Sequence, residues 1–202
     1  MKTTLFLSAW GLVLLSAGCS ETSQTAASPK SEPVQPITGQ TALYRMYQVA
    51  RMWAPDAQVL KMNSIHLTAL PAVRGKAGAW EATFTSAARS AGRSYTYSVL
   101  EEEGNLHEGV FKGREESLSG PAEKSFLIAA VKIDTDKAYQ KADKQAGDYD
   151  QKNPNQTISF LLEKQEKFPD PVWRVIWGES LGTSGLSVLI DATTGMYLET
   201  LH

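Results

Sequence analysis

The sequence predicts an α+β fold made of two tandem units, each with one helix packed on a curved antiparallel sheet of three or four strands. Apolar residues follow a helical period in residues 41–53 and 135–146, and runs that alternate apolar and polar residues come after each of these segments. Short sequence patterns of the first half also return about 90 residues later in the same order. A unit of this kind buries the apolar faces of helix and sheet against each other.

The first unit begins with the helix at 41–53, where Thr41 can cap the N-terminus and Pro55 ends the helical pattern. Gly104 and Asn105 are typical of a tight turn between antiparallel strands. Strands are expected in four stretches after the helix: 56–67, 80–85, 95–99 and 106–112.

The second unit begins with the helix at 135–146, which Asp134 or Thr135 can cap and which Gly147 ends. Apolar residues at 126–131 form either a strand or the approach to this helix. Strands are expected at 157–165, 171–177, 186–190 and 196–201.

The repeated patterns support a duplicated unit. Tyr-Gln-x-Ala at 47–50 returns at 139–142, and Ser-Val-Leu at 98–100 returns at 187–189. The alternative is chance agreement between short helix and strand patterns. Duplication divides the folded part into a first unit at 38–112, a connector at 113–132 and a second unit at 133–202.

A family resemblance rests on the second unit. Trp-Arg-Val at 173–175, followed by Ser-Val-Leu-Ile-Asp-Ala-Thr-Thr-Gly at 187–195, resembles the end of a PepSY-type domain. The resemblance covers residues 133–200, whereas the first half matches only in outline because Glu-Glu-Glu-Gly-Asn at 101–105 replaces the family's turn. It implies a cystatin-like module that binds a partner or regulates a peptidase, not an enzyme.

Three residues of this motif also have a purely structural explanation. The side chains of Asp191 and Thr193 can bond the backbone of a turn, and Gly195 can adopt a positive φ angle. On this explanation the motif supports the fold and says little about function.

The N-terminus resembles a bacterial lipoprotein signal peptide, residues 1–18. Lys2 is positively charged, residues 5–15 are apolar but too few to span a bilayer, and small residues precede Cys19. The resemblance implies cleavage before Cys19 and acyl chains, such as palmitate, on this residue. The position three before the cysteine holds Ser16 where leucine is usual. The alternative is an ordinary secretory signal that leaves Cys19 as a free thiol.

Residues 19–37 are expected to form a disordered tether. They are rich in Ser, Thr and Pro and poor in large apolar residues, so they cannot bury enough surface to offset their ordering entropy. Fully extended, the tether reaches about 60 Å from the lipid. In Gram-negative lipoproteins an Asp after the cysteine retains the protein in the inner membrane. Ser20 stands there instead, which favours the outer membrane, facing the periplasm.

Composition excludes several classes of protein. The formal net charge is −2 and no basic stripe is present, so nucleic acid is not an expected partner. A single cysteine cannot form a disulfide within the chain. The expected partners are the membrane, through the N-terminal lipid, and an envelope protein or peptide.

No pattern in the sequence indicates a catalytic, cofactor or metal site. The three histidines lack metal-ligand spacing, no Ser stands in a nucleophile elbow, and no Gly-rich phosphate loop is present. His66 stands on an expected strand and is interpreted as structural. Glu101–Glu103 with Glu108 could bind calcium weakly, as could Asp148 with Asp150 and Asn153, but solvated loops explain both groups. We therefore expect a protein without enzymatic activity.

Four aromatic residues are candidates for a partner-binding face: Trp173, Trp177, Tyr95 and Tyr97. Residues two or four apart on a strand share a face. If that face points outward it forms a binding patch, and if it points inward these residues belong to the core.

The sequence therefore predicts a cell-envelope lipoprotein that acts as a non-enzymatic binding module, with regulation of an envelope peptidase as the specific version. The alternative is a module that binds a small ligand or peptidoglycan. A hydrolase with an unrecognised site is a third class.

The variant Cys19→Ala tests the anchor. We expect it to remain unprocessed or to become soluble, because it lacks the sulfur that carries the lipid and acyl chains supply about 0.8 kcal/mol of membrane affinity per buried CH2. Membrane fractionation and the mass of the mature chain measure this. A variant that fractionates with membranes as the wild type does contradicts the lipoprotein prediction.

Overall fold

The computed structural model describes residues 33–102, 106–117 and 124–202. The predicted signal peptide, Cys19, Ser20 and the tether up to residue 32 lie outside these ranges, as do Gly104 and Asn105. The described strands are β1 Gln58–Ile65, β2 Ala79–Ser86, β3 Ala91–Ser98, β4 Gly109–Ser117, β5 Ile158–Lys164, β6 Pro171–Trp177, β7 Leu186–Asp191 and β8 Tyr197–Leu201.

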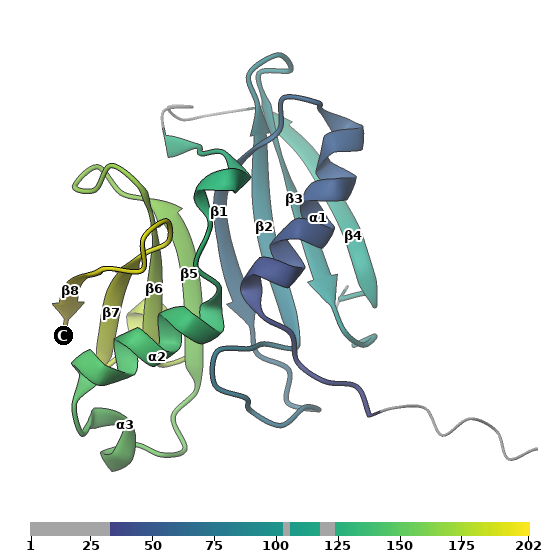
Figure 1. The fold of residues 1–202 in the computed structure, drawn as a ribbon. Helices are drawn as coiled ribbons and strands as arrows, with labels where there is room; N and C mark the ends of the chain where they lie inside the picture. Colours follow the sequence, from purple (N-terminus) through teal and green to yellow (C-terminus); the bar gives the residue numbers. More distant parts are fainter. Residues whose placement is uncertain (1–32, 103–105, 118–123) are drawn as a thin grey trace, which may run out of the picture. The chain divides into compact units, whose positions relative to one another are not determined.

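These eight strands join in one antiparallel sheet in the order β4-β3-β2-β1-β5-β6-β7-β8 (Figure 1). The prediction of two tandem helix-on-sheet units is therefore wrong. β1 and β5, the first strands of the two expected units, pair through Lys61↔Glu163, Met62↔Leu162 and Asn63↔Leu161. As separate units they would each leave a row of unpaired backbone groups at an edge, and pairing at these three positions satisfies part of both rows.

The predicted connector at 113–132 is also part of the fold. β4 extends to Ser117, and Phe126 forms a backbone bridge with Val59 of β1. Within 126–131, the apolar stretch contains a short 3-10 helix, η2 (Ile128–Ala130).

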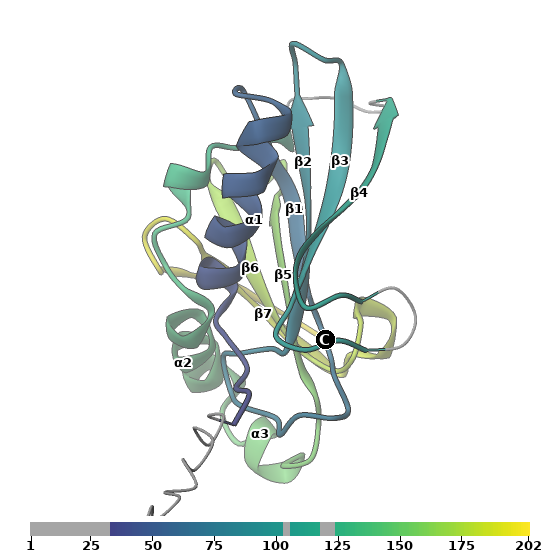
Figure 2. The same cartoon turned by 90° about the vertical axis from the view of Figure 1, so that its right-hand side faces the viewer.

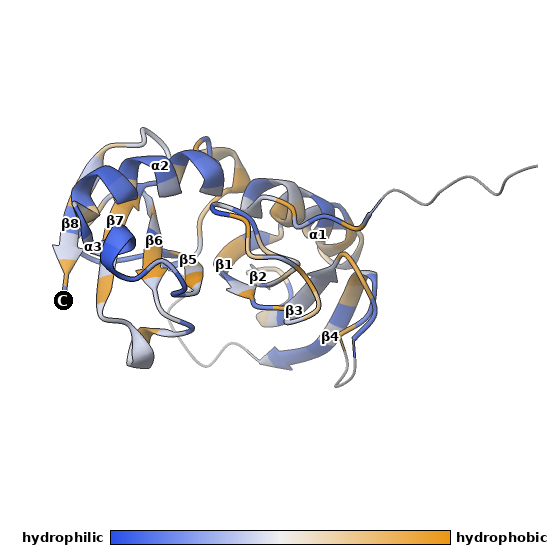
Figure 3. Cartoon of the chain, turned by 90° about the horizontal axis from the view of Figure 1, so that it is seen from below, coloured by the Kyte–Doolittle hydropathy of each residue, from blue (hydrophilic) through white to orange (hydrophobic). Residues whose placement is uncertain are grey.

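Two long helices lie on the same side of the sheet (Figures 2 and 3). Helix α1 (Gly39–Trp53) contacts β2 and β3, and α2 (Thr135–Ala146) contacts β6 and β7. Both helices form where the helical period predicts them, although α1 starts two residues before Thr41 and its N-cap is Thr38. A short helix, α3 (Tyr149–Lys152), and a 3-10 turn, η3 (Leu181–Thr183), complete the described elements.

The N-termini of α1 and α2 share one set of capping groups. The Asp134 carboxylate accepts hydrogen bonds from the backbone N–H of Thr135 at 2.7 Å and of Gln40 at 2.9 Å. The Thr135 hydroxyl accepts from the N–H of Gly39 at 2.8 Å and donates to the carbonyl of Gly75 at 2.6 Å. Residues at the start of α2 thus satisfy N–H groups that the first turn of α1 leaves without a partner.

The apolar core is continuous beneath both helices. The Phe160 ring of β5 lies 6.0 Å from Trp80 of β2 and 6.5 Å from Trp173 of β6, centroid to centroid. The indole N–H groups of these tryptophans donate to the carbonyls of Ile37 and Ile133. Phe160 therefore joins the two halves of the core through direct packing.

This continuity predicts that the folded part unfolds in a single transition. Replacing Phe160, which is 1% exposed, with Ala should lower the free energy of unfolding by about 3–5 kcal/mol. Phe111→Ala is the matched control, since Phe111 is 45% exposed and should lose less than about 1 kcal/mol. Chemical denaturation followed by both fluorescence and circular dichroism measures this. Two separated transitions would contradict a common core.

Candidate functional site

The residues of the predicted turn motif have structural roles, as the structural explanation expected. Asp191 accepts hydrogen bonds from the N–H groups of Thr193 and Thr194, each at 2.8 Å. The Thr193 hydroxyl donates to the carbonyl of Ala130, and Gly195 has a φ of +74°. The motif therefore holds the β7–β8 turn against η2.

The four candidate aromatic residues do not form an exposed face. Trp173, Trp177, Tyr95 and Tyr97 are all buried in the core under the helices, so the interpretation as a partner-binding patch is wrong. Strand periodicity placed the members of each pair on one face but could not show that a helix covers it.

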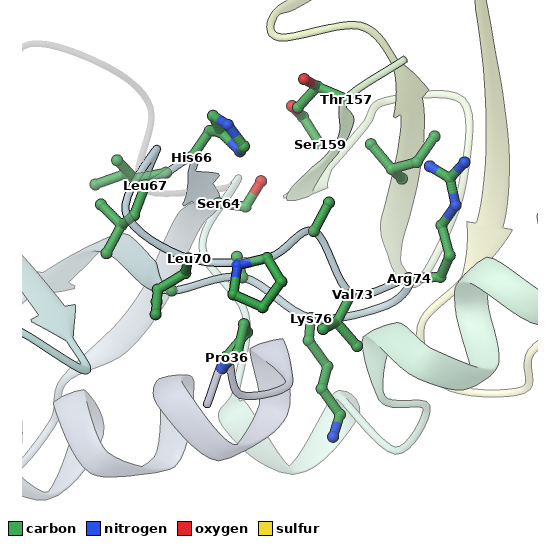
Figure 4. A pocket seen from close by; sticks show the side chains of 16 residues that line it. Pro36, Ser64, His66, Leu67, Leu70, Val73, Arg74, Lys76, Thr157 and Ser159 are labelled. Atoms are coloured by element: carbon green, nitrogen blue, oxygen red, sulfur yellow. The ribbon is translucent and has the colours of Figure 1, made fainter. Parts of the chain in front are cut away.

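A small cavity lies where β1 and β5 separate (Figure 4). Their ladder stops at Asn63↔Leu161, and the next link is a hydrogen bond from the Phe160 N–H to the Ser64 hydroxyl at 2.9 Å. The loop between β1 and β2, residues 66–78, lines the cavity together with Ser159. His66, interpreted as structural, is an exposed residue of this loop.

This cavity is much smaller than the usual pocket for an organic ligand. It measures about 40 Å³, enough for a few water molecules and far below the roughly 300–1,000 Å³ of pockets that enclose drug-sized molecules. A wider hollow of about 570 Å³, beside Arg45, Tyr97 and Glu108, is an open depression. The Arg45 guanidinium lies 4.9 Å above the Tyr97 ring and donates to its hydroxyl. Neither space supports a small-ligand site of the usual enclosed kind.

The loop at 66–78 is held by a polar network around Asp150. This carboxylate forms an ion pair with Arg74 at 3.1 Å and accepts hydrogen bonds from the Trp177 indole at 3.0 Å and the Tyr139 hydroxyl at 3.1 Å. Arg74 also donates to the carbonyls of Pro154 and Gln156. The network fixes the loop against α3 and the segment before β5.

The electrostatics of this network follow from burial and from two neighbouring carboxylates. Burial, followed by the nearby charge of Asp150, raises the pKa of Asp143. Burial, with the charges of Asp143 and Asp150, raises the pKa of Tyr139 to about 12. Asp143 thus ionises in the folded protein at some cost in stability.

The acidic residues considered for weak calcium binding do not form a metal site among the described residues. Glu101 accepts from His107 at 2.7 Å and from the N–H of Glu108, which lower its pKa, the backbone bond most. Asp148 pairs with Lys152 at 2.6 Å. Among the described residues, no three His, Cys, Asp or Glu side chains are grouped so as to hold a metal ion. Glu103 lies outside those residues.

The two edge strands of the sheet differ in chemistry. β4 is almost fully exposed, but four of its nine residues are charged, and a register irregularity interrupts its pairing with β3. In β8 the one charged residue, Glu199, is paired with Lys167 at 2.7 Å. The pairing of β7 with β8 is interrupted in the same way, between Leu189 and Ile190. Charges and bulges protect natural edges from pairing with other chains, so the smaller number of charges alone makes β8 the less protected edge.

Comparison with known proteins yields one structural likeness. No protein-family model matches the chain, and no curated protein matches it. A crystal structure of a "putative lipoprotein" from Clostridium difficile 630 has a TM-score of 0.49 and 9% identity, with 79% of this chain and 91% of that chain covered. A likeness this distant carries no argument about function, and the resemblance to PepSY domains receives no support from a family match.

Within the part of the chain that the structure describes, no helix has the length and apolar character needed to cross a membrane. The prediction from sequence did not identify Arg74 as a residue that holds the loop at 66–78, and it predicted the strand at 196–201 without placing it at an edge of the sheet. The only available signals were an uncharged run at 68–73 and a scarcity of charge at 197–201.

Two substitutions in the Asp150 network should have opposite effects. Asp143→Asn should stabilise the protein at pH 7 by less than about 1 kcal/mol, because it removes a carboxylate whose pKa is raised on folding. This gain should disappear below the ordinary pKa of 3.8, where Asp143 is protonated in both folded and unfolded chains. Asp150→Asn should cost about 1–2 kcal/mol at pH 7, because three donors lose their charged acceptor.

Urea denaturation at pH 7 and again near pH 3 measures both variants. A loss of stability in Asp143→Asn at pH 7 would show that this carboxylate has a favourable partner, contrary to the electrostatics described above.

Proposed function

We propose that this chain is a lipid-anchored protein of the cell envelope that binds a protein partner by adding an extended segment of it to strand β8. The proposal has two parts, an anchor at Cys19 and a binding edge, and no catalytic step. It keeps the first class of function that the sequence predicts, a cell-envelope lipoprotein that acts as a non-enzymatic binding module.

The anchor is supported by the sequence of the N-terminus. A positive residue, a short apolar run and small residues come before the single cysteine, and a Ser-, Thr- and Pro-rich stretch follows it. Location in the outer membrane is the finer proposal, and it rests on Ser20 alone.

The binding edge is supported by the contrast between β4 and β8. The outer side of β8 is unpaired in the sheet order, and its Tyr197 side chain is 44% exposed. Backbone N–H and C=O groups at such an edge can bind any extended segment, and side chains along the edge then select among segments. The neutralised Glu199 leaves little charge to repel an incoming strand.

The class of partner is a finer proposal. An envelope peptidase is the version that the resemblance of residues 173–195 to PepSY domains favours. The alternative, peptidoglycan or a small ligand, would use a concave or enclosed site, and the small cavity beside Ser64 does not support it.

Tyr197→Lys tests the edge, with Tyr44→Lys as the matched control. Tyr44 lies on α1 and is 43% exposed, so both variants place a lysine at an equally exposed tyrosine. Lysine on an edge strand blocks pairing with another chain. Lipidated protein purified from detergent-solubilised envelope should retain one specific protein in the wild type and in Tyr44→Lys. Tyr197→Lys should retain about tenfold less, a loss of about 1.4 kcal/mol in binding.

Equal retention by both variants would contradict binding at β8. Recovery of glycan in place of protein would support the peptidoglycan alternative, and turnover of a substrate in a hydrolase panel would overturn the proposal of a non-enzymatic module. Thermal unfolding of each variant confirms that the fold is intact.

A further inference from the structure

The loop between β1 and β2 exposes an uncharged, mostly apolar segment, here called the apolar loop. Residues 68–73 read Thr-Ala-Leu-Pro-Ala-Val, and all of them except the half-buried Leu70 are exposed. Val73 at its end is 36% exposed. Single exposed apolar residues are normal on a protein surface, whereas adjoining ones such as these are candidates for a site of interaction.

The base of the apolar loop is firmly held. Arg74 is bound by Asp150, and the Gly75 carbonyl accepts from the Thr135 hydroxyl. Gly75 has a φ of +79° and lies against the backbone of Asp136, so a side chain at this position would clash. The exposed apolar side chains therefore belong to a loop whose base is fixed to the rest of the fold by Arg74 and Gly75.

The chain enters the folded part beside this loop. Ile37 and Ala77 exchange two backbone hydrogen bonds of 3.0 Å, and Pro36 lines the small cavity together with Leu70 and Val73 (Figure 4). The last residue of the predicted tether is thus bonded to the base of the loop. Residues 20–32 separate Cys19 from the first described residue, a distance of at most about 45 Å at 3.3 Å per residue.

The short segment between Cys19 and residue 33 limits how far the apolar loop can lie from the bilayer. A lipid at Cys19 keeps the apolar loop within a few tens of ångströms of the bilayer and raises its effective concentration there to the millimolar range. A few aliphatic side chains give only marginal membrane affinity by themselves, as a single acyl chain does. Because the tether confines the loop near the bilayer, this weak affinity is sufficient to keep the loop inserted.

The charge beside the loop has the sign that anionic headgroups attract. Lys76 is exposed and has no ion-pair partner among the described residues. Of the nearby carboxylates, Asp150 pairs with Arg74 and Asp136 with Lys137, whereas Asp134 and Asp143 have no ion-pair partner among the described residues. Lys76 is therefore the unpaired cation next to the apolar segment, and a basic residue near an anionic lipid surface adds to membrane affinity.

We propose that the apolar loop inserts into the interfacial layer of the bilayer that holds the Cys19 lipid, with Lys76 at the headgroups. This inference rests on the lipid anchor of the proposed function and adds a defined orientation to it. The loop lies at the N-terminal end of α1, so the C-terminal end of this helix points away from the bilayer (Figures 1 and 2). The apolar loop is then the second of two membrane contacts, the first being the lipid on Cys19.

A single labelled thiol tests insertion. In the mature lipidated protein the sulfur of Cys19 is blocked, so Val73→Cys supplies one reactive thiol for an environment-sensitive dye. Met52→Cys is the matched control, because Met52 is 79% exposed and lies near the far end of α1. The protein is reconstituted in vesicles of phosphatidylethanolamine and phosphatidylglycerol. The dye at position 73 should shift its emission to the blue and be quenched by lipids that carry a quencher near the headgroup, whereas the dye at position 52 should do neither.

The outcomes separate the two proposals. Protein that floats with the vesicles, but whose two labels behave alike, retains the anchor and overturns insertion of the loop. Wild-type protein that does not float overturns the anchor and, with it, the orientation that depends on it. Adding Lys76→Glu should reduce quenching at position 73 in vesicles that contain phosphatidylglycerol and have no effect in pure phosphatidylethanolamine–phosphatidylcholine vesicles. If Lys76→Glu leaves the quenching at position 73 unchanged in vesicles that contain phosphatidylglycerol, Lys76 has no role in insertion.

Discussion

The fold depends on a polar junction at Asp134 and Thr135, where the N-termini of both long helices meet. Each helix begins with N–H groups that have no intrahelical partner and with the positive end of its dipole. One carboxylate and one hydroxyl satisfy groups of both helices, and the same hydroxyl donates to Gly75 in the loop between β1 and β2. Removing this junction would leave buried donors without acceptors in α1 and α2 together.

The junction and the sheet support each other. With both helices held on one side, the tryptophans of β2 and β6 meet across the Phe160 ring of β5, and the core has no boundary between its halves. A continuous sheet has only two edges to protect, whereas two separate sheets would have four. Irregular pairing occurs at both edges, but β4 carries four charged residues and β8 one, and this difference in charge singles out β8 as the proposed edge for a partner's strand.

The proposed membrane and partner contacts lie on separate parts of the fold. The apolar loop is fixed by Thr135 and Asp150, the groups that also hold the helix N-termini and α3, so its position follows from the core. The β8 edge is held by the Asp191 turn and by pairing with β7. Binding costs less ordering entropy when the edge is already held in place, and the turn and the pairing with β7 hold this one.

The sequence alone determined the local structure. The helical period predicted α1 and α2, alternation predicted most strands to within a few residues, and Asp191 with Gly195 predicted the β7–β8 turn. The N-terminal pattern around Cys19 is likewise readable without coordinates, because a processing signal is a linear feature.

Only the tertiary structure decided how these elements combine. Periodicity reports which face of an element is buried, but it does not report which strand edges pair. The link between Met62 and Leu162 and the bond from Gly39 to Thr135 therefore left no trace in local sequence. The same limit explains why both a core position and an exposed patch stayed open for Trp173 and Trp177, and why Arg74 was not recognised as the residue that holds the apolar loop. Two strands about 100 residues apart pair only if no other strand edge of the chain binds either of them better. Which edges pair therefore depends on the complete core, and local sequence does not specify it.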